Sequence, residues 1–372
     1  MAGLYIHVPF CASRCIYCGF YSTIMPQLRN DYIDAVCKEM TLRRDYLPQD
    51  DRTIHTLYIG GGTPSLLLPR HFEQLFESIH RNFEVCPEET TVEVNPDDIT
   101  AELAQCLHHV GVDRVSMGAQ TFDDSRLQFL RRRHRTADVA RAVDTLRENG
   151  ITNISIDLMF GFPTETAEEW MIDLNHALTL DVPHISAYSL MYEEGTPLYR
   201  MLQNGQIEEI ADELSLQMYD MLTDTLVSAG YRHYEISNFA RPGYEARHNG
   251  SYWQDIPYIG LGAAAHSYCL TSRQWNVSDI HRYMADIAED HIPMQSEPID
   301  ERTHYDDLIT TALRTAEGLD LNVLTTAQRD YLNTNVQNHL CEGNVEIADH
   351  HLRLTRKGLY ISDLVMSDLM MV

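Results

Sequence analysis

The sequence predicts an α/β protein that folds as a partial (β/α)6 barrel, followed by a small C-terminal helical domain resembling a winged helix. Two observations lead to this prediction. Short apolar, β-branched runs alternate with longer amphipathic runs in the first half of the chain, which is typical of parallel strands joined by crossover helices. After Leu190 the pattern loosens, and helices with a short hairpin close the chain. Six strand–helix units favour an open or partial barrel over the closed eightfold form.

The predicted strands are short apolar runs near Leu4–Val8, Ile54–Ile59, Thr91–Val94, Arg114–Met117, Ile154–Leu158 and His184–Leu190. Amphipathic helices are expected between them, at Leu28–Leu47, His71–Phe83, Ala101–Val110, Ala137–Asn149 and Ala167–Leu180. Thr136 is suited to cap the fourth helix and Gly150 to end it. Thr166 and Glu169 predict a capping box before the fifth.

The second half of the chain divides less clearly. A helix is expected from Ile210 to Ala229, followed by a segment rich in Tyr, His, Gly and Trp. The charged, Pro-containing segment 289–307 is expected to be a linker, so that residues 1–290 form the core and 300–372 a second domain. In the second domain, residues 349–351 predict the turn of a hairpin.

Composition and charge narrow the class of partner. The 372 residues carry a net charge of −27, which opposes binding to nucleic acid or to an anionic membrane surface. From Asp300 onward, twelve acidic residues face six basic ones, so a lid or packing role is favoured over DNA binding. No signal segment or membrane span is apparent, and eight irregularly spaced cysteines fit a reducing cytoplasm.

Cys11, Cys15 and Cys18 form a C-x3-C-x2-C run just after the first predicted strand. Three thiolates on one loop can hold three irons of a four-iron cluster and leave the fourth iron open for chemistry. A zinc site and a redox-active thiol pair are the alternatives. Structural zinc usually takes a second pair of ligands, whereas the other five cysteines are scattered singly. The spacing therefore favours a cluster.

Polar and glycine-rich residues follow all six predicted strands. Besides the cysteines, they are the run 60–65 (GGGTPS), Glu93 with Asn95, Gln120, Asp157 and Tyr188. Taken one at a time, each can be explained without a ligand, as a strand-to-helix turn, a solvated charge or a carboxylate that caps a helix. Because the carboxyl ends of parallel strands meet at one rim, six such segments together predict a binding site there.

At the level of longer phrases, the chain resembles a known family. The cysteine run is similar to that of radical S-adenosylmethionine (SAM) proteins. One branch is matched by YIHVPFC, YIGGGTPSLL, RVSMGAQTFDDSRLQFLRRRH, IDLMFGFPTET and YEISNFARPGYEARHNGSYW. That branch holds the oxygen-independent coproporphyrinogen III oxidases and the HemW heme chaperones. The resemblance implies a partial (β/α)6 barrel with a [4Fe–4S] cluster and SAM at its open rim.

The resemblance also implies roles for single residues. Cys11, Cys15 and Cys18 would bind the cluster, and SAM would chelate the open iron through its amino and carboxylate groups. Glycines allow close approach of the backbone, carboxylates accept from ribose hydroxyls or the amino group, and arginine pairs with a carboxylate. The implied SAM contacts are Tyr5, Gly61, Gly62, Thr63, Glu93, Gln120, Arg132 and Asp157.

Departures from the oxidases indicate the chaperone branch. The oxidases carry a further Cys two residues after the third ligand, where this chain has Phe20, and they begin with an extension that is not expected here. The HNGSYW segment resembles the heme-binding H-N-x-x-Y-W pattern of the chaperones, at His248, Asn249, Tyr252 and Trp253. Gly19 stands where many members have Asp, which would alter hydrogen bonding around the cluster.

Two functions of different class follow from the resemblance. The first is a heme chaperone that binds heme, with His248 as the axial ligand, and passes it to an acceptor protein. The second is a radical SAM enzyme that decarboxylates the propionates of a porphyrinogen. Without the resemblance, a histidine hydrogen-bonded within an aromatic cluster is the ordinary reading of His248. Phe20 and the short N-terminus favour the chaperone, and a homodimer is a further expectation.

Overall fold

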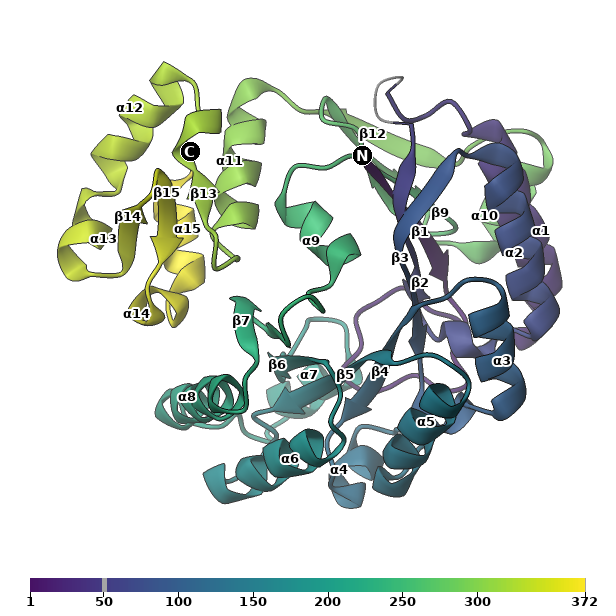
Figure 1. The fold of residues 1–372 in the computed structure, drawn as a ribbon, viewed down its shortest axis with the longest axis horizontal. Helices are drawn as coiled ribbons and strands as arrows, with labels where there is room; N and C mark the ends of the chain where they lie inside the picture. Colours follow the sequence, from purple (N-terminus) through teal and green to yellow (C-terminus); the bar gives the residue numbers. More distant parts are fainter. Residues whose placement is uncertain (49–51, 372) are drawn as a thin grey trace.

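The computed structural model describes residues 1–48 and 52–371 and confirms the predicted α/β fold (Figure 1). In these residues twelve strands form one sheet, in the order β12-β11-β10-β9-β1-β2-β3-β4-β5-β6-β8-β7. The six central strands are parallel, and five crossovers join each strand to the next. They are β1 Ala2–Val8, β2 Ile54–Gly61, β3 Val85–Val94, β4 Arg114–Gln120, β5 Asn153–Phe160 and β6 His184–Ser189.

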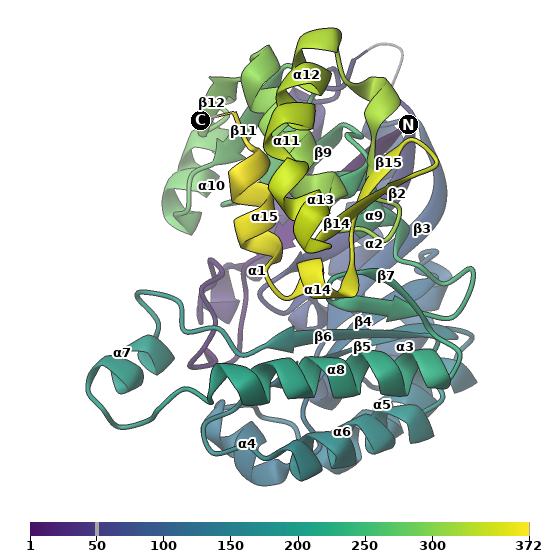
Figure 2. The same ribbon diagram turned by 90° about the vertical axis from the view of Figure 1, so that its left-hand side faces the viewer.

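Helices cover the outer face of this curved sheet (Figure 1). They are α1 Arg29–Leu42, α2 Pro69–Asn82, α3 Ala101–His109, α4 Asp124–Phe129, α5 Thr136–Glu148, α6 Ala167–Thr179 and α8 Asp212–Ser228. The short helix α7 Pro197–Gln203 projects to the side of the sheet instead (Figure 2), where Leu198 N donates to Ile16 O of the cysteine loop at 2.9 Å. The first helix ends five residues earlier than expected. Arg43 is its C-cap, and the buried guanidinium of Arg43 donates to Gly260 O at 2.8 Å and pairs with Glu39.

The capping predictions were partly right. Thr166 accepts from the Glu169 backbone N–H, and the reciprocal bond completes the capping box at α6. At α5, however, Thr136 is the first helical residue, and the cap is Arg135 with Asp138 accepting its backbone N–H at 2.8 Å. Gly150 follows the helix end at φ +91°, a conformation that glycine adopts without strain.

The sheet continues past the predicted barrel at both sides. On the β1 side it gains β9 Tyr258–Leu261, β10 His266–Tyr268, β11 Ser272–Asn276 and β12 Met294–Pro298, with α9 Arg247–Trp253 and α10 Ile280–Ala288 between them. On the β6 side it gains β8 Asn238–Ala240 and β7 Arg232–Glu235. The segment 289–307, expected to be a linker, contains the edge strand β12 and the start of α11, and the division of the chain into two domains stays a prediction.

The C-terminal part has a hydrophobic core of its own, built around Tyr305, Leu332 and Leu352. Its elements are α11 Glu301–Ala312, β13 Leu319–Asp320, α12 Thr326–Asn335, α13 Gln337–Glu342, β14 Val345–Ala348, β15 His351–Leu354, α14 Arg356–Leu359 and α15 Ser362–Leu369 (Figure 2). The predicted hairpin joins β14 and β15, and its turn residues Asp349 and His350 both have positive φ. Val372 lies outside the described residues.

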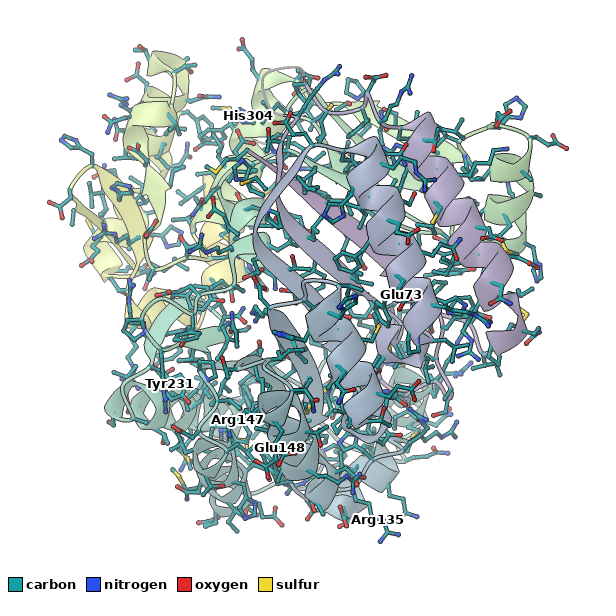
Figure 3. The ribbon with its side chains drawn as sticks, turned by 45° about the vertical axis from the view of Figure 1, so that its right-hand side comes forward. Glu73, Arg135, Arg147, Glu148, Tyr231 and His304 are labelled. Carbon is teal, nitrogen blue, oxygen red and sulfur yellow. The ribbon has the colours of Figure 1, made fainter. Side chains whose placement is uncertain are left out.

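Polar contacts fasten this part to the sheet. His304 lies on α11 (Figure 3). Its Nε2 donates to Asp255 Oδ2 at 2.8 Å. Arg314 donates to the buried Glu235 Oε1 at 3.0 and 3.1 Å, and its guanidinium lies 5.2 Å from the ring centroid of Trp253. Among the helices of the described residues, none combines the length and the apolar character that a bilayer crossing requires.

Candidate active site and ligand cavity

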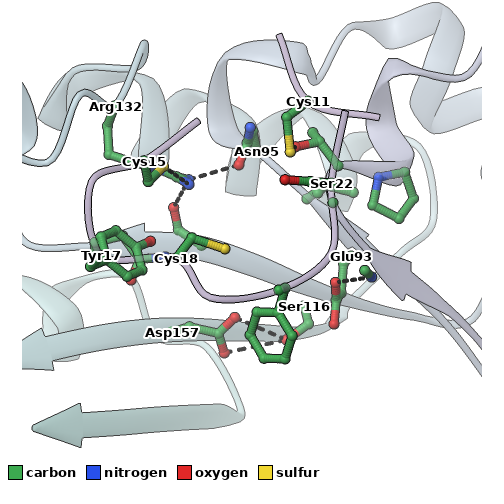
Figure 4. Close-up of a pocket in the computed structure, with 18 of the residues that line it drawn as sticks. Cys11, Cys15, Tyr17, Cys18, Ser22, Glu93, Asn95, Ser116, Arg132 and Asp157 are labelled. Atoms are coloured by element: carbon green, nitrogen blue, oxygen red, sulfur yellow. Dashed lines mark hydrogen bonds between the residues drawn. The ribbon is translucent and has the colours of Figure 1, made fainter. Parts of the chain in front are cut away.

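A cavity of about 650 Å³ opens at the carboxyl ends of the central strands and extends into the barrel (Figure 4). The structure brings the six predicted segments together on its wall, together with helix α9. All the residues implied as cluster or SAM contacts line it: Tyr5, Cys11, Cys15, Cys18, Gly61, Gly62, Thr63, Glu93, Gln120, Arg132 and Asp157. Their roles toward these groups stay predictions.

The cysteine loop follows β1 and lies at the cavity wall (Figure 4). The Cys11 backbone N–H donates to Thr23 O at 2.8 Å, and Thr63 Oγ1 donates to Cys11 Sγ at 3.6 Å. Arg132 Nη1 donates to Cys15 Sγ at 3.8 Å. Burial raises the pKa of the Cys11 thiol and raises that of Cys18 to about 11.

The donor set fits a cluster better than a single metal ion. Within residues 1–48 and 52–371, no three His, Cys, Asp or Glu side chains converge on a point where one ion could bind. A zinc ion needs such convergence. A cluster does not, because each thiolate binds a different iron. That Cys11, Cys15 and Cys18 each hold one iron of a cluster stays a prediction.

Gly61, the last residue of β2, and Gly62, which follows it, allow two backbone segments to approach closely, a role that the sequence did not indicate. Gly61 has φ +115°, and a Cβ there would lie 2.6 Å from the His7 ring. A Cβ at Gly62 would lie 2.8 Å from the backbone of Pro9 and Phe10. The absent side chains thus allow the end of β2 to pack against the start of the cysteine loop. This packing holds Thr63 beside Cys11.

Two half-buried carboxyl groups line the cavity, Glu93 from β3 and Asp157 from β5, with β4 between these strands. Glu93 accepts from Tyr58 OH at 2.7 Å and from the Gly61 backbone N–H at 2.9 Å. Burial raises the pKa of Glu93 to about 7, although both hydrogen bonds oppose this shift. Asp157 accepts from Ser116 Oγ at 3.3 Å, and burial raises its pKa as well. Near neutral pH, Glu93 can accept or donate a hydrogen bond to a ligand.

Among the consecutive arginines of the run RRRHR, Arg132 and Arg133 form different contacts. Its Nη2 donates to Asn95 Oδ1 and to Gly118 O, both at 2.7 Å, and so the guanidinium is fixed at the cavity wall. Arg133 instead pairs with Asp97 and Asp98 at 3.0 and 2.7 Å. Nearby, Gln120 has φ +67°, where the pairing of β4 with β5 shifts register.

His248 lies apart from the cavity surface. Its side chain is fully buried, Nδ1 is 2.8 Å from Thr56 Oγ1, and Nε2 is 2.7 Å from Tyr252 OH. The ring stacks on Tyr58 with centroids 5.1 Å apart, and burial lowers the pKa of His248 to about 3. Two other residues of the HNGSYW segment, Asn249 and Tyr252, do line the cavity, unlike His248. The axial-ligand role of His248 stays a prediction.

Sequence reasoning missed Tyr58, Arg114 and Ser116 on the cavity wall. Arg114 had been predicted only as the start of a strand. The signal was nevertheless present, because Arg114, Ser116, Gly118 and Gln120 alternate with apolar residues along β4. Period-2 alternation places residues on the same face of a strand. An inward polar face in a buried parallel strand indicates a cavity.

A parallel partial barrel with three cysteines on the loop after its first strand defines a radical SAM protein. In agreement with this, the model of the radical SAM superfamily matches residues 5–177. Such proteins carry a [4Fe–4S] cluster and SAM, and the cavity described above offers side chains suited to both.

Relatives of known name narrow the class. Heme chaperone HemW of Bacillus subtilis is 38% identical over 296 residues, which span 79% of this chain and 78% of the relative. Heme chaperone HemW of Mycobacterium tuberculosis H37Rv is 32% identical and covers 99% of this chain and 94% of the relative. The chain belongs to the HemW family. Coproporphyrinogen III oxidase of Escherichia coli superposes with a TM-score of 0.86 over 99% of this chain and 89% of the oxidase, and its 21% identity shows the fold alone.

Proposed function

We propose that this protein is a heme chaperone that binds heme and passes it to an acceptor protein, carrying a [4Fe–4S] cluster and SAM. The observation that carries the proposal is the match to a protein named heme chaperone over 99% of the chain at 32% identity. The likeness to the coproporphyrinogen oxidase is weaker in sequence and concerns the fold. The acceptor protein and a homodimer stay predictions.

Different residues of the cavity would bind the cluster and SAM. Three thiolates hold the cluster and leave one iron without a protein ligand. A bound cluster supplies one-electron chemistry toward SAM. Thr63 and Arg132 orient the cysteine loop through their bonds to Cys11 and Cys15. Glu93 and Asp157 offer half-buried oxygens to the amino or hydroxyl groups of SAM, and hydrogen bonds to charged groups are strong in such a setting.

Exposed apolar side chains on the cavity wall support heme as the cargo. Phe20, where the oxidases carry a further Cys, is 75% exposed, and Met191 is 63% exposed. Large exposed apolar residues that cluster at a cavity mark a binding surface. A porphyrin presents broad apolar faces that these side chains can cover. For His248 to bind the iron, its ring would exchange its bonds to Thr56 and Tyr252 for the metal.

Heme binding and transfer test the proposal directly. The anaerobically reconstituted protein should show a Soret band with heme, lose it to an added apo-haemoprotein, and leave the propionates of coproporphyrinogen III intact. Replacing Cys11, Cys15 and Cys18 by Ala should remove iron and sulfide from the protein, whereas Cys37→Ala, outside the loop, should keep them. Decarboxylation of coproporphyrinogen III without transferable heme would instead establish the enzyme.

A further inference from the structure

Arg114 is a buried arginine whose charge is not matched by a direct partner. Its side chain lines the cavity, yet the residue is only 2% exposed. Within residues 1–48 and 52–371, no hydrogen bond or ion pair to the guanidinium is present, and its Nε is buried without an acceptor. Buried charges are normally paired, because an unpaired one loses its hydration without compensation.

A second buried arginine shows what compensation looks like in this protein. Arg43 is 4% exposed and donates to Gly260 O, Ser267 Oγ and Gln274 Oε1 at 2.8 to 3.1 Å. It also pairs with Glu39. The fold therefore supplies acceptors to a guanidinium that only supports structure. Arg114 lacks them and borders open space instead.

The carboxyl groups that line the cavity near Arg114 form their hydrogen bonds with other residues. Glu93 is bonded to Tyr58 and Gly61, and Asp157 to Ser116. The positive charge of Arg114 lowers the pKa of both groups, but burial outweighs it, and the pKa of each remains raised. Both carboxyl groups thus retain protons more readily than usual. The inner part of the cavity consequently presents a donor-rich cation to any ligand.

The position of Arg114 separates it from the cysteine loop. It is the first residue of β4, whereas Gln120, on the same face, ends that strand at the rim. Asn249 and Tyr252 of α9 line the same cavity, and the charge of Arg114 helps to lower the pKa of the adjacent His248. The inner end of the cavity is thus formed by Arg114 and by the segment that resembles a heme-binding motif.

We propose that Arg114 binds a carboxylate of the ligand that enters the inner end of the cavity, and that this carboxylate is a propionate of heme. The identity of the ligand rests on the proposed function. A guanidinium matches a carboxylate with two parallel N–H···O bonds, and the match is strong where water is excluded. The carboxylate of SAM is the alternative, but it is expected beside the cysteine loop at the opposite end of the strands.

Esterified heme tests this inference without any substitution. The reconstituted protein should bind heme roughly ten- to a hundred-fold more tightly than heme dimethyl ester, as expected for a charged hydrogen-bonded pair. Arg114→Met should bind both forms equally, at the affinity of the ester, and Arg114→Lys should fall between. Arg133→Met is the matched control, because Arg133 also lines the cavity but is paired with Asp97 and Asp98. It should discriminate as the parent does.

The other outcomes are distinct. Heme binding by the parent with no preference over the ester overturns the role of Arg114 and leaves the proposed function intact, whereas absence of heme binding refutes the proposed function. Loss of SAM affinity in Arg114→Met, with heme affinity unchanged, would assign the arginine to SAM.

Thermal unfolding separates ligand binding from a supporting role of Arg114 in the fold. A supporting role predicts that Arg114→Met lowers the melting temperature. An unpaired buried charge predicts an unchanged or higher one. If Arg114→Met does not fold, the ester comparison on the parent and on Arg114→Lys decides.

Discussion

Glu93 shows how burial sets the chemistry of a single residue. Burial raises the pKa of Glu93 to about 7 in the folded protein, from 4.5 for the free side chain. Between these values the folded state binds more protons than the unfolded state, so the free energy of unfolding falls as pH rises through this window. Glu93→Gln removes this dependence. Its stability relative to the parent should therefore rise by about 2 to 4 kcal/mol between pH 4 and pH 8.

Urea unfolding at several pH values measures this change, with the exposed Glu102→Gln as the control. Parallel pH profiles for the parent and Glu93→Gln would show that Glu93 ionises as an ordinary surface glutamate does.

His248 is the residue for which the structure adds most to the sequence. Its ring is fully buried, with both nitrogens hydrogen-bonded. His248→Ala should lower the free energy of unfolding by roughly 2 to 4 kcal/mol, since it leaves a cavity and two unpaired hydroxyl partners. The exposed His109→Ala should change it by less than about 0.5 kcal/mol. A variant as stable as the parent would mean that the ring is not packed as described. Heme titrations of His248→Ala are interpretable only beside this measurement.

Single residues were predictable where a motif fixes them, and less so where only packing does. The cysteine spacing and GGGTPS led directly to the cavity wall. Arg114 and Tyr58 were missed because each lies inside a strand, and their direction depends on strand register. The packing role of Gly61 against the His7 ring was not predictable either, because it depends on how β1 and β2 pair, and its contact with SAM stays a prediction.

At the scale of elements, the junction between β2 and the cysteine loop depends on Gly61. Gly61→Ala should lower the free energy of unfolding by about 2 kcal/mol or more, because φ is +115° and the added Cβ would lie 2.6 Å from His7. Gly250 in α9 offers the matched control. It has no atom within 4 Å of its ideal Cβ position, so Gly250→Ala should stabilise by roughly 0.5 to 1 kcal/mol. Thermal unfolding of the two variants should move in opposite directions.

The parallel strands and their helices were predictable because each repeats a strong hydrophobic period. The strands β7 to β12 could not be predicted from the sequence, because they are short and carry no clear hydrophobic period. They have three to five residues each, and β12 is exposed at every position. Their place is set by pairing with distant strands, as when β9 joins β1 across some 250 residues of chain.

At the scale of the whole molecule, the C-terminal part is held to the sheet by Arg314. Its partner Glu235 is buried, and loss of the arginine would leave Glu235 Oε1 without a donor. Arg314→Met should lower the free energy of unfolding by roughly 1 to 3 kcal/mol, because the arginine itself is about one-third exposed. Adding Glu235→Gln should restore part of the loss.

The control for this pair is Arg356→Met, which breaks an exposed contact with Asp220 and Asp224 and should cost less than about 1 kcal/mol. Hydrogen exchange at residues 313–318 adds a local measurement, which should quicken in Arg314→Met alone. Equal effects of the two variants would show that burial of Glu235 is unimportant. The sequence did not reveal this attachment, because Arg314 and Glu235 are brought together only by the tertiary fold.

The open sheet has a consequence for how the molecule behaves in a crowded solution. A sheet that does not close exposes unpaired backbone groups, which attract strands of other chains and promote aggregation. Here the β7 side is occupied, since Ile236 N donates to Arg314 O and Ala316 N to Tyr234 O, both at 3.0 Å. At the opposite side, β12 is short and ends in Glu297 and Pro298, a charge and a residue without an N–H. Both boundaries of the sheet thus discourage edge-to-edge association.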